Sequence, residues 1–424
     1  MARKLTFLHA ADLHIGAPFR GMRESAPRWA DQLTGAITDA YDRLISTAIS
    51  REVDFVVIAG DIFDSARSSY ADYRRFFSGL ERLEEANIPV YLCLGNHDPY
   101  STWEQDFFAL PANATVFDAV APSFALYERD GEPLCVLGGR SFLNNVWPND
   151  TSIADGITRA NAIAALGEKA ARAPFAVGVL HTGLTFDPHK APCDPVVLQS
   201  AGMSYWALGH IHKLWVDSED DPRIAYSGCI QGRDIREVGR RGVGIVTLEE
   251  GKPNRYEFVS TASIAWQQLM VDVGDCANVS AVVDKVMRAQ FDVNGHMRCD
   301  KMISRIALCG ETPLHELLSQ PGVVDDVRAA LIESYPAFYV DALTDATTRP
   351  VDREALIEEN LFPGSFLRTA REQRACPDEL AAYVQREFLE RNMVLPSEAL
   401  EGLDDLAAEA ENLVLDMLVR GEAR

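Results

Sequence analysis

Short apolar segments alternate with longer amphipathic ones through about the first 260 residues. Residues 54–59 and 90–94 are continuous apolar runs, typical of strands that are buried on both faces of a sheet. Residues 32–50 repeat apolar positions every three or four residues, which predicts an amphipathic helix. By the same criteria we expect strands at 5–10, 176–180, 205–208 and 242–248, and helices at 70–86 and within 151–174. Strands that alternate with helices predict a layered α/β core.

The pattern changes after about residue 258. Residues 266–273, 302–309 and 338–342 are expected to be strands, and residues 280–291 and 323–333 to be helices. This β-α-β-α-β order predicts a small second domain. We therefore expect three parts, at residues 1–260, 261–346 and 347–424.

The last part of the chain is expected to be helical. Pro396, Ser397 and Glu398 are typical of a helix start. Apolar positions then recur with a 3-4-3-4 spacing, at Leu403, Leu406, Ala410, Leu413 and Met417. Two interpretations stay open for this seam, which either packs on its own domain or docks onto the coiled coil of a partner.

The composition is that of a folded protein, with 47% hydrophobic and 24% charged residues. Against 40 basic residues there are 63 acidic ones, so that the net charge is −23. Such a surface repels nucleic acids and anionic membranes at long range. Contact with a polyanion therefore requires a local basic patch or a metal site.

The eight cysteines are scattered and form no C-x-x-C pair, as is typical of thiols in a reducing cytosol. No apolar run approaches the roughly 18 residues that a membrane-spanning helix needs. We therefore expect a cytoplasmic protein.

Five polar motifs each follow an expected strand. They are Asp12-Leu13-His14, Gly60-Asp61-Ile62-Phe63-Asp64, Gly95-Asn96-His97-Asp98, His181-Thr182-Gly183 and Gly209-His210-Ile211-His212. Proteins with α/β architecture place ligands at the carboxyl ends of strands. Each motif alone is a weak signal, but the five in this order form a strong one. His9, within the first strand, is expected to pack in the core or to support the site.

The residue types in these motifs indicate a metal centre. Mixed nitrogen and oxygen donors suit Mn²⁺, Fe²⁺ or Zn²⁺ and argue against Ca²⁺. Residues two apart in an extended segment point to the same side, so that Asp12 can act with His14, and His210 with His212. Two such ions about 3.5–4 Å apart clamp a phosphoryl group and activate water. The motifs therefore predict phosphoester hydrolysis.

Longer strings carry a family resemblance. Residues 7–14 (Phe-Leu-His-Ala-Ala-Asp-Leu-His), 60–64 and 95–99 resemble SbcD-like DNA repair exonucleases of the calcineurin-like metallophosphoesterase superfamily. The first string, followed by Ala17-Pro18-Phe19, is similar to the YhaO group, and the match covers about residues 5–248. The resemblance implies a layered β-sandwich core flanked by helices, a small α+β DNA-capping domain and a helical C-terminal tail.

The resemblance also implies residue roles. One metal would be held by Asp12, His14, Asp61 and His212, and the other by Asp61, Asn96, His181 and His210, with Asp61 bridging. His97 would contact the scissile phosphate and help to protonate the leaving 3′ oxygen, while Asp64 would orient a neighbour such as His97. Family enzymes use manganese, act with an SbcC-like coiled-coil ATPase and form homodimers.

Basic residues near the last motif offer a local answer to the acidity of the chain. We expect a phosphate-contacting rim made of Lys213, Arg233, Arg236, Arg240 and Arg241. A solvated hairpin turn is the alternative interpretation of this segment.

The function predicted from the sequence is that of a metal-dependent DNA exonuclease, which acts in DNA repair with an SbcC-like ATPase. A small-substrate phosphodiesterase or phosphatase of the same superfamily is one alternative. A subunit that binds DNA ends or the ATPase, with a non-essential metal centre, is the other. The complete ligand set argues against the latter, and the extension of about 160 residues beyond the core favours the nuclease.

Overall fold

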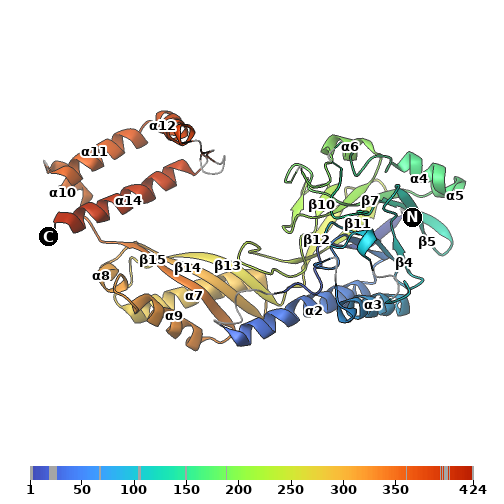
Figure 1. Cartoon of the computed structure of the whole chain (residues 1–424), viewed down its shortest axis with the longest axis horizontal. Helices are drawn as coiled ribbons and strands as arrows, with labels where there is room; N and C mark the ends of the chain where they lie inside the picture. Colours follow the sequence, from blue (N-terminus) through green and yellow to red (C-terminus); the bar gives the residue numbers. More distant parts are fainter. Residues whose placement is uncertain are drawn as a thin grey trace. The chain divides into compact units, whose positions relative to one another are not determined.

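The structure is a computed structural model that describes residues 3–18, 26–65, 68–103, 107–148, 150–187, 189–359, 361–391, 393, 395, 400 and 402–422. Phe19 and the helix start expected at 396–398 lie outside the described residues. The chain forms two compact units (Figure 1). One comprises Met1–Gln267 and Val293–Ile303, and the other Gln268–Asp292 and Ser304–Arg424.

Two six-stranded sheets form the centre of the first unit (Figure 1). The strands of the first sheet are, in spatial order, β12 (Arg255–Ser260), β11 (Gly242–Glu249), β1 (Lys4–Ala10), β2 (Phe55–Ala59), β3 (Val90–Cys93) and β4 (Ala114–Val116). Those of the second are β5 (Ser123–Arg129), β6 (Glu132–Gly139), β7 (Phe175–His181), β8 (Tyr205–Gly209), β10 (Ile224–Tyr226) and β9 (Trp215–Val216). Strands β1 to β4 run parallel, as do β6, β7, β8 and β10, so that their carboxyl ends are aligned within each sheet.

The two sheets pack face to face. The ring of Phe7 on β1 lies 4.9 Å from that of Phe55 on β2 and 5.5 Å from that of Tyr205 on β8 of the other sheet. All three side chains are fully buried in one apolar cluster, which both sheets line. Because side chains alternate along a strand, Leu8 and Ala10 of β1 point to the opposite face, into a second cluster.

Helices cover the outer face of each sheet. The second cluster joins the first sheet to α2 (Pro27–Ser50) and α3 (Tyr70–Glu85), through buried side chains such as Tyr41 and Phe76. A third cluster joins the second sheet to α4 (Arg159–Leu166), α5 (Glu168–Ala171) and α6 (Pro195–Ser200). A short 3-10 helix, η1 (Tyr100–Thr102), follows the third motif. The layers are helix, sheet, sheet, helix, and the predicted sandwich core is confirmed.

The second unit is built on a smaller sheet of three strands. Their order is β13 (Ile264–Asp272), β14 (Lys301–Glu311) and β15 (Phe338–Thr348). Buried side chains of α7 (Val279–Met297), α8 (His315–Leu318) and α9 (Val323–Ser334) pack against this sheet. These elements follow the predicted β-α-β-α-β order.

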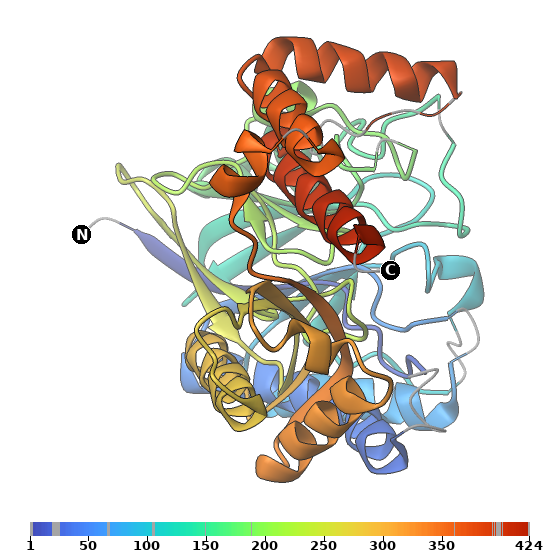
Figure 2. The ribbon, with the colours of Figure 1, turned by 90° about the vertical axis from the view of Figure 1, so that its left-hand side faces the viewer.

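The tail of the second unit is helical, as predicted. It contains α10 (Arg353–Glu358), α11 (Phe362–Arg374), α12 (Pro377–Glu390) and α14 (Leu403–Glu422). Helices α11 and α14 lie side by side (Figures 1 and 2), and Arg374 forms an ion pair with Asp404 over 2.9 Å. Leu406, Leu413 and Met417 of the predicted seam are exposed. No helix among the described residues is long and apolar enough to cross a membrane.

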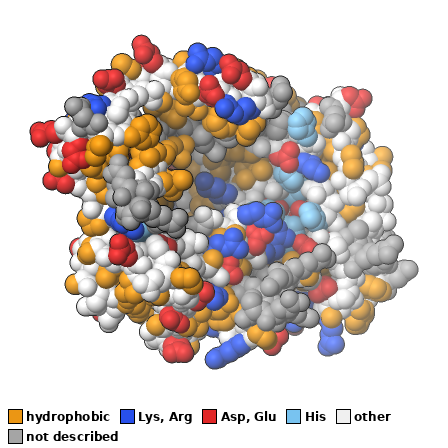
Figure 3. All heavy atoms as spheres, turned by 60° about the vertical axis from the view of Figure 1, so that its left-hand side comes forward, with side chains coloured by type: hydrophobic (Ala, Val, Ile, Leu, Met, Phe, Trp, Pro, Cys, Tyr) orange, Lys and Arg blue, Asp and Glu red, His pale blue; other side chains and the backbone are white. Residues whose placement is uncertain are grey.

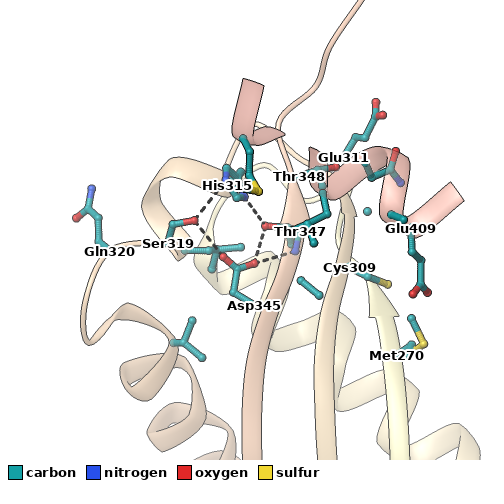
Figure 4. Close-up of a pocket in the computed structure, with 18 of the residues that line it drawn as sticks. Met270, Cys309, Glu311, His315, Ser319, Gln320, Asp345, Thr347, Thr348 and Glu409 are labelled. Atoms are coloured by element: carbon teal, nitrogen blue, oxygen red, sulfur yellow. Dashed lines mark hydrogen bonds between the residues drawn. The ribbon is translucent and has the colours of Figure 1, made fainter. Parts of the chain in front are cut away.

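A cavity of about 990 Å³ lies between the three-stranded sheet and α14 (Figure 4). On one side of it, Nδ1 of His315 lies 3.0 Å from the Thr347 hydroxyl, and Ser319 donates to Asp345 over 3.2 Å. None of the site residues predicted above is among the described residues that line this cavity. The predicted site lies in the first unit instead.

Candidate metal centre

The loops after β1 and β2 carry two of the five motifs and are held together by main-chain hydrogen bonds. The amides of Asp12, His14 and Ile15 donate to the carbonyl oxygens of Gly60, Asp61 and Ile62, over 3.1, 3.0 and 2.8 Å. These bonds continue the β1–β2 pairing beyond the ends of the strands. The two motifs therefore lie side by side at the same edge of the sheet.

Four motif residues have a strained backbone. The φ angles of Asp12, His14, Asp61 and His210 are 51°, 46°, 51° and 100°, in the left-handed region that residues other than glycine rarely adopt. Each such conformation costs about 1–3 kcal/mol and persists only where its surroundings enforce it. Its repeated use at motif residues is typical of a functional site.

Two motif glycines let the loops approach closely. A Cβ atom on Gly95 would lie 2.1 Å from Oδ1 of Asp61, and one on Gly60, at φ 86°, would lie 2.5 Å from Nδ1 of His181. No side chain fits at either distance. The glycines are therefore required for the carboxylate of Asp61 and the ring of His181 to reach their positions.

Donor atoms of the first predicted metal site converge from both sheets. Nε2 of His14 lies 3.1 Å from Nε2 of His212 and 3.7 Å from Oδ2 of Asp61. Nε2 of His212 lies 3.9 Å from Oδ1 of Asp12. Two unprotonated ring nitrogens at 3.1 Å repel each other unless a proton or a cation lies between them. This donor set fits a borderline divalent ion.

Donor atoms of the second predicted site meet on the other side of Asp61. Nε2 of His181 lies 3.4 Å from Oδ2 of Asp61 and 3.2 Å from the amide oxygen of Asn96. Nδ1 of His181 donates to the carbonyl oxygen of Ala59 over 2.9 Å, which leaves the lone pair on Nε2. The ring of His210 lies 5.2 Å from that of His181. Oδ2 of Asp61 thus faces histidines of both predicted sites.

The centre is buried and its charges are strongly coupled. Asp12, His14, Asp61 and His181 are all at most 1% exposed. Burial lowers the pKa of His181, but the carboxylates of Asp61 and Asp12 outweigh this effect and raise the pKa to about 9. Burial raises the pKa of Asp61, but the nearby histidines lower it well below the usual range. Buried carboxylates of this kind require cationic partners.

Three carboxylates contact the ring nitrogens that face away from the centre. Nδ1 of His212 lies 2.6 Å from Oε1 of Glu237, Nε2 of His210 lies 3.1 Å from Oδ2 of Asp187, and Nδ1 of His14 lies 3.1 Å from Oδ1 of Asp64. Carboxylates placed in this way orient ligand histidines.

Glu237 and Asp187 were not predicted from the sequence. They lie in long loops that follow β10 and β7, and no motif marks them. Their roles depend on which loop folds over which strand end, and that information is not local.

His97 lies at the exposed side of the centre. Its ring is 5.0 Å from that of His14, and its Nδ1 donates to the main-chain oxygen of Asp64 over 2.8 Å. Asp64 therefore contacts His97 through its backbone, whereas its carboxylate contacts His14. Figure 3 shows histidine side chains at the surface beside acidic and basic ones.

The predicted basic rim is not one continuous group. Arg236 is 87% exposed and pairs with Asp234, and Lys213 is also exposed. Arg233 is only 22% exposed, and its guanidinium contacts Asp64 and Glu237.

The two remaining arginines of the predicted rim pack on the protein. Arg241 is buried, where it donates to the main-chain oxygens of His212 and Val238. The guanidinium of Arg240 lies 4.5 Å from the ring centre of Phe258. The expectation that Arg241 contacts phosphate is therefore wrong, because its side chain is enclosed by the protein.

Comparison with known proteins gives the family. The model of the calcineurin-like phosphoesterase family matches residues 5–214, and that of the middle domain of metallophosphoesterase YhaO matches residues 266–348. The chain is 30% identical over 338 residues to the uncharacterized metallophosphoesterase YhaO of Bacillus subtilis, with 78% of each chain covered. It is 24% identical to the DNA double-strand break repair protein Mre11 of Aeropyrum pernix (66% of this chain, 67% of that one) and 26% identical to the SbcD component of the nuclease SbcCD from Escherichia coli (66% and 74%). The chain therefore belongs to the calcineurin-like metallophosphoesterases, with a YhaO-type middle domain that follows the catalytic core.

Proposed function

We propose that this phosphoesterase is a metal-dependent DNA exonuclease that acts in DNA repair with an SbcC-like ATPase. The observation that carries the proposal is the convergence of nitrogen and oxygen donors from both sheets around Asp61. The names of two relatives, a DNA double-strand break repair protein and a component of a nuclease, support DNA as the substrate and an ATPase as the partner. A homodimer and a DNA-capping role for the middle domain belong to the same proposal.

The donor set fits two divalent ions, for which we propose Mn²⁺. Asp12, His14, Asp61 and His212 would hold one ion, and Asp61, Asn96, His181 and His210 the other. The chemistry that such a pair supplies when bound is polarisation of the phosphate and activation of water. Asp61, with His14 on one side and His181 on the other, is the bridging ligand of this proposal.

His97 is the proposed general acid. Its Nδ1 is committed to the main-chain oxygen of Asp64, which fixes the ring and leaves Nε2 available. The ring is exposed beside His14, at the edge of the buried centre. From this position His97 contacts the scissile phosphate and gives a proton to the leaving 3′ oxygen.

Lys213 and Arg236 are the proposed DNA contacts. Both are exposed in the segments that follow the last motif, and their positive charge offsets the acidity of the chain locally. Arg233 was also expected to bind substrate, but its guanidinium is engaged by two carboxylates of the protein.

The test is hydrolysis by the purified full-length chain with Mn²⁺. A 3′-labelled DNA duplex is compared with bis-p-nitrophenyl phosphate, and His97→Ala serves as the control. Stepwise loss of nucleotides that is absent in the variant supports the exonuclease. If the small diester is cleaved while DNA stays intact, with and without the ATPase, the substrate is a small phosphodiester and the proposal is wrong. DNA-repair function that survives in the inactive variant would identify a binding subunit instead.

A further inference from the structure

Arg233 lies between two carboxylates that each contact a histidine of the first proposed metal site. Its Nη1 donates to Oδ1 of Asp64 over 2.8 Å, and its Nη2 donates to Oε1 of Glu237 over 2.9 Å. Oδ1 of Asp64 is 3.1 Å from Nδ1 of His14, and Oε1 of Glu237 is 2.6 Å from Nδ1 of His212. One guanidinium therefore joins two carboxylate–histidine pairs.

These contacts determine which nitrogen of each histidine faces the metal. Nη2 of Arg233 also lies 3.1 Å from Nδ1 of His212, but the carboxylate of Glu237 is closer and assigns the proton to Nδ1. The carboxylate of Asp64 has the same relation to His14. Both rings then present Nε2, and these two atoms face each other at 3.1 Å.

Arg233 is held firmly in this place. Its main-chain amide donates to Oε2 of Glu237 over 2.7 Å, so that the carboxylate is gripped by the backbone and the side chain of the same residue. The side chain is 22% exposed, and its planar, permanently charged fork suits two carboxylates better than lysine does. These contacts leave little of the guanidinium for a DNA phosphate.

The charge of Arg233 also bears on where a cation can bind. Two further clusters are compact enough to hold a metal ion: His14 with Asp64 and His97, and His212 with Cys229 and Glu237. Each contains one of the two carboxylates that the guanidinium contacts. A cation in either cluster would lie beside a fixed positive charge. Arg233 thus opposes metal binding there and leaves the central position, beside Asp12 and Asp61, as the favoured one.

We propose that Arg233 is a positioning residue of the metal centre, which holds Asp64 and Glu237 so that His14 and His212 bind the first ion through Nε2. The inference rests on the proposed metal centre but not on DNA as the substrate.

The experiment measures Mn²⁺ binding to the metal-free full-length protein by isothermal titration calorimetry. In Arg233→Gln, one of the two binding events is expected to weaken by about 10–100-fold, as is usual when a residue that supports a ligand histidine is removed. The matched control is Arg236→Gln, which removes the same charge three residues away from a side chain that contacts Asp234. It is expected to bind Mn²⁺ as the wild type does. Unchanged affinities in Arg233→Gln would overturn the inference.

Two further variants separate positioning from folding. Arg233→Lys keeps the charge but not the fork, and is expected to weaken the same binding event while its circular dichroism and metal-free melting temperature stay those of the wild type. A double-mutant cycle with Glu237→Ala is expected to be non-additive, because both residues act on His212. Additive losses, or wild-type binding by Arg233→Lys, would contradict the inference.

The calorimetry also separates this inference from the proposed function. A wild-type protein that binds two Mn²⁺ ions, loses one affinity in Arg233→Gln and leaves DNA intact would support the inference and overturn the nuclease. A wild-type protein that binds no Mn²⁺ would overturn both.

Discussion

The main-chain amide of His97 donates a hydrogen bond to Oδ1 of Asp61 over 3.0 Å. The other oxygen of this carboxylate lies 3.7 Å from Nε2 of His14 and 3.4 Å from Nε2 of His181. One side chain therefore fixes the loop after β3 and faces histidines from both sheets. The first predictions below follow from this arrangement.

Substitution of Asp61 is expected to abolish activity. Asp61→Asn keeps the size of the side chain and an oxygen that can accept the bond from His97, but it removes the charge that both proposed ions share. We expect Mn²⁺-dependent hydrolysis to fall to background and both binding events to weaken in calorimetry. Asp300→Asn, at a surface carboxylate that pairs with Arg43, is the control. Hydrolysis by Asp61→Asn at the wild-type rate would refute the bridging role.

Substitution of His97 is expected to separate binding from turnover. His97→Ala removes an exposed ring whose Nδ1 contacts a main-chain oxygen, so that Mn²⁺ affinity is expected to stay unchanged. Turnover on DNA is expected to fall by about 10²–10⁴-fold, the usual contribution of a general acid. The loss is expected to be smaller on bis-p-nitrophenyl phosphate, because p-nitrophenolate leaves without a proton. Equal losses on both substrates would argue against proton donation.

Metal binding is expected to stabilise the fold. A ligand that binds only the native state at 100 times its dissociation constant adds about 2.7 kcal/mol per site. We therefore expect Mn²⁺ to raise the melting temperature and a chelator to reverse the increase. Asp61→Asn is expected to show little of this shift. A shift of wild-type size in that variant would place the stabilising ion elsewhere.

His9 is expected to make the fold sensitive to acid. It is fully buried between the sheets, where Nδ1 lies 3.0 Å from the hydroxyl of Tyr205 and Nε2 lies 3.2 Å from the carbonyl oxygen of Leu208. Burial lowers the pKa of His9 from 6.5 to about 3. Between these two values the unfolded chain binds a proton that the native state cannot accept. The free energy of unfolding therefore falls with decreasing pH, by up to about 1.4 kcal/mol per pH unit from this group.

The measurement for His9 is urea unfolding between pH 7 and pH 4, in the presence of a chelator. His9→Gln is expected to be less stable than the wild type at pH 7 but to lose stability more slowly on acidification. Parallel pH profiles for the two proteins would show that His9 does not contribute. Other acidic and histidine side chains titrate in both proteins, so that their effect cancels in the comparison.

Strand-end chemistry was accessible from the sequence because it is local. The continuous apolar run at 54–59 corresponds to β2, and Asp61 follows it directly. Parallel strands align their carboxyl ends, so that motifs hundreds of residues apart were expected to meet. The structure brings His14 and His212 together in this way, although 197 residues separate them. Whether these residues bind metal stays a prediction.

The parts that were missed depend on long-range packing or on weak local signals. The β5–β6 hairpin was not predicted, although Asp130-Gly131 is a common turn pair and Gly131 has φ 80°. The supporting carboxylates Asp187 and Glu237 lie on loops whose course over the strand ends cannot be derived from local patterns. Arg241 shows that a cluster of charges along the chain does not reveal which side chain is buried.

The proposed ligands are divided between the two sheets. Asp12, Asp61 and Asn96 follow strands of the first sheet, whereas His181 and His210 belong to strand ends of the second. Neither sheet alone carries a complete ligand set for either ion. A nascent or partly unfolded chain would therefore hold no competent centre, and hydrolysis would be confined to molecules in which the sandwich has closed. The division protects nucleic acid from the enzyme until folding is complete.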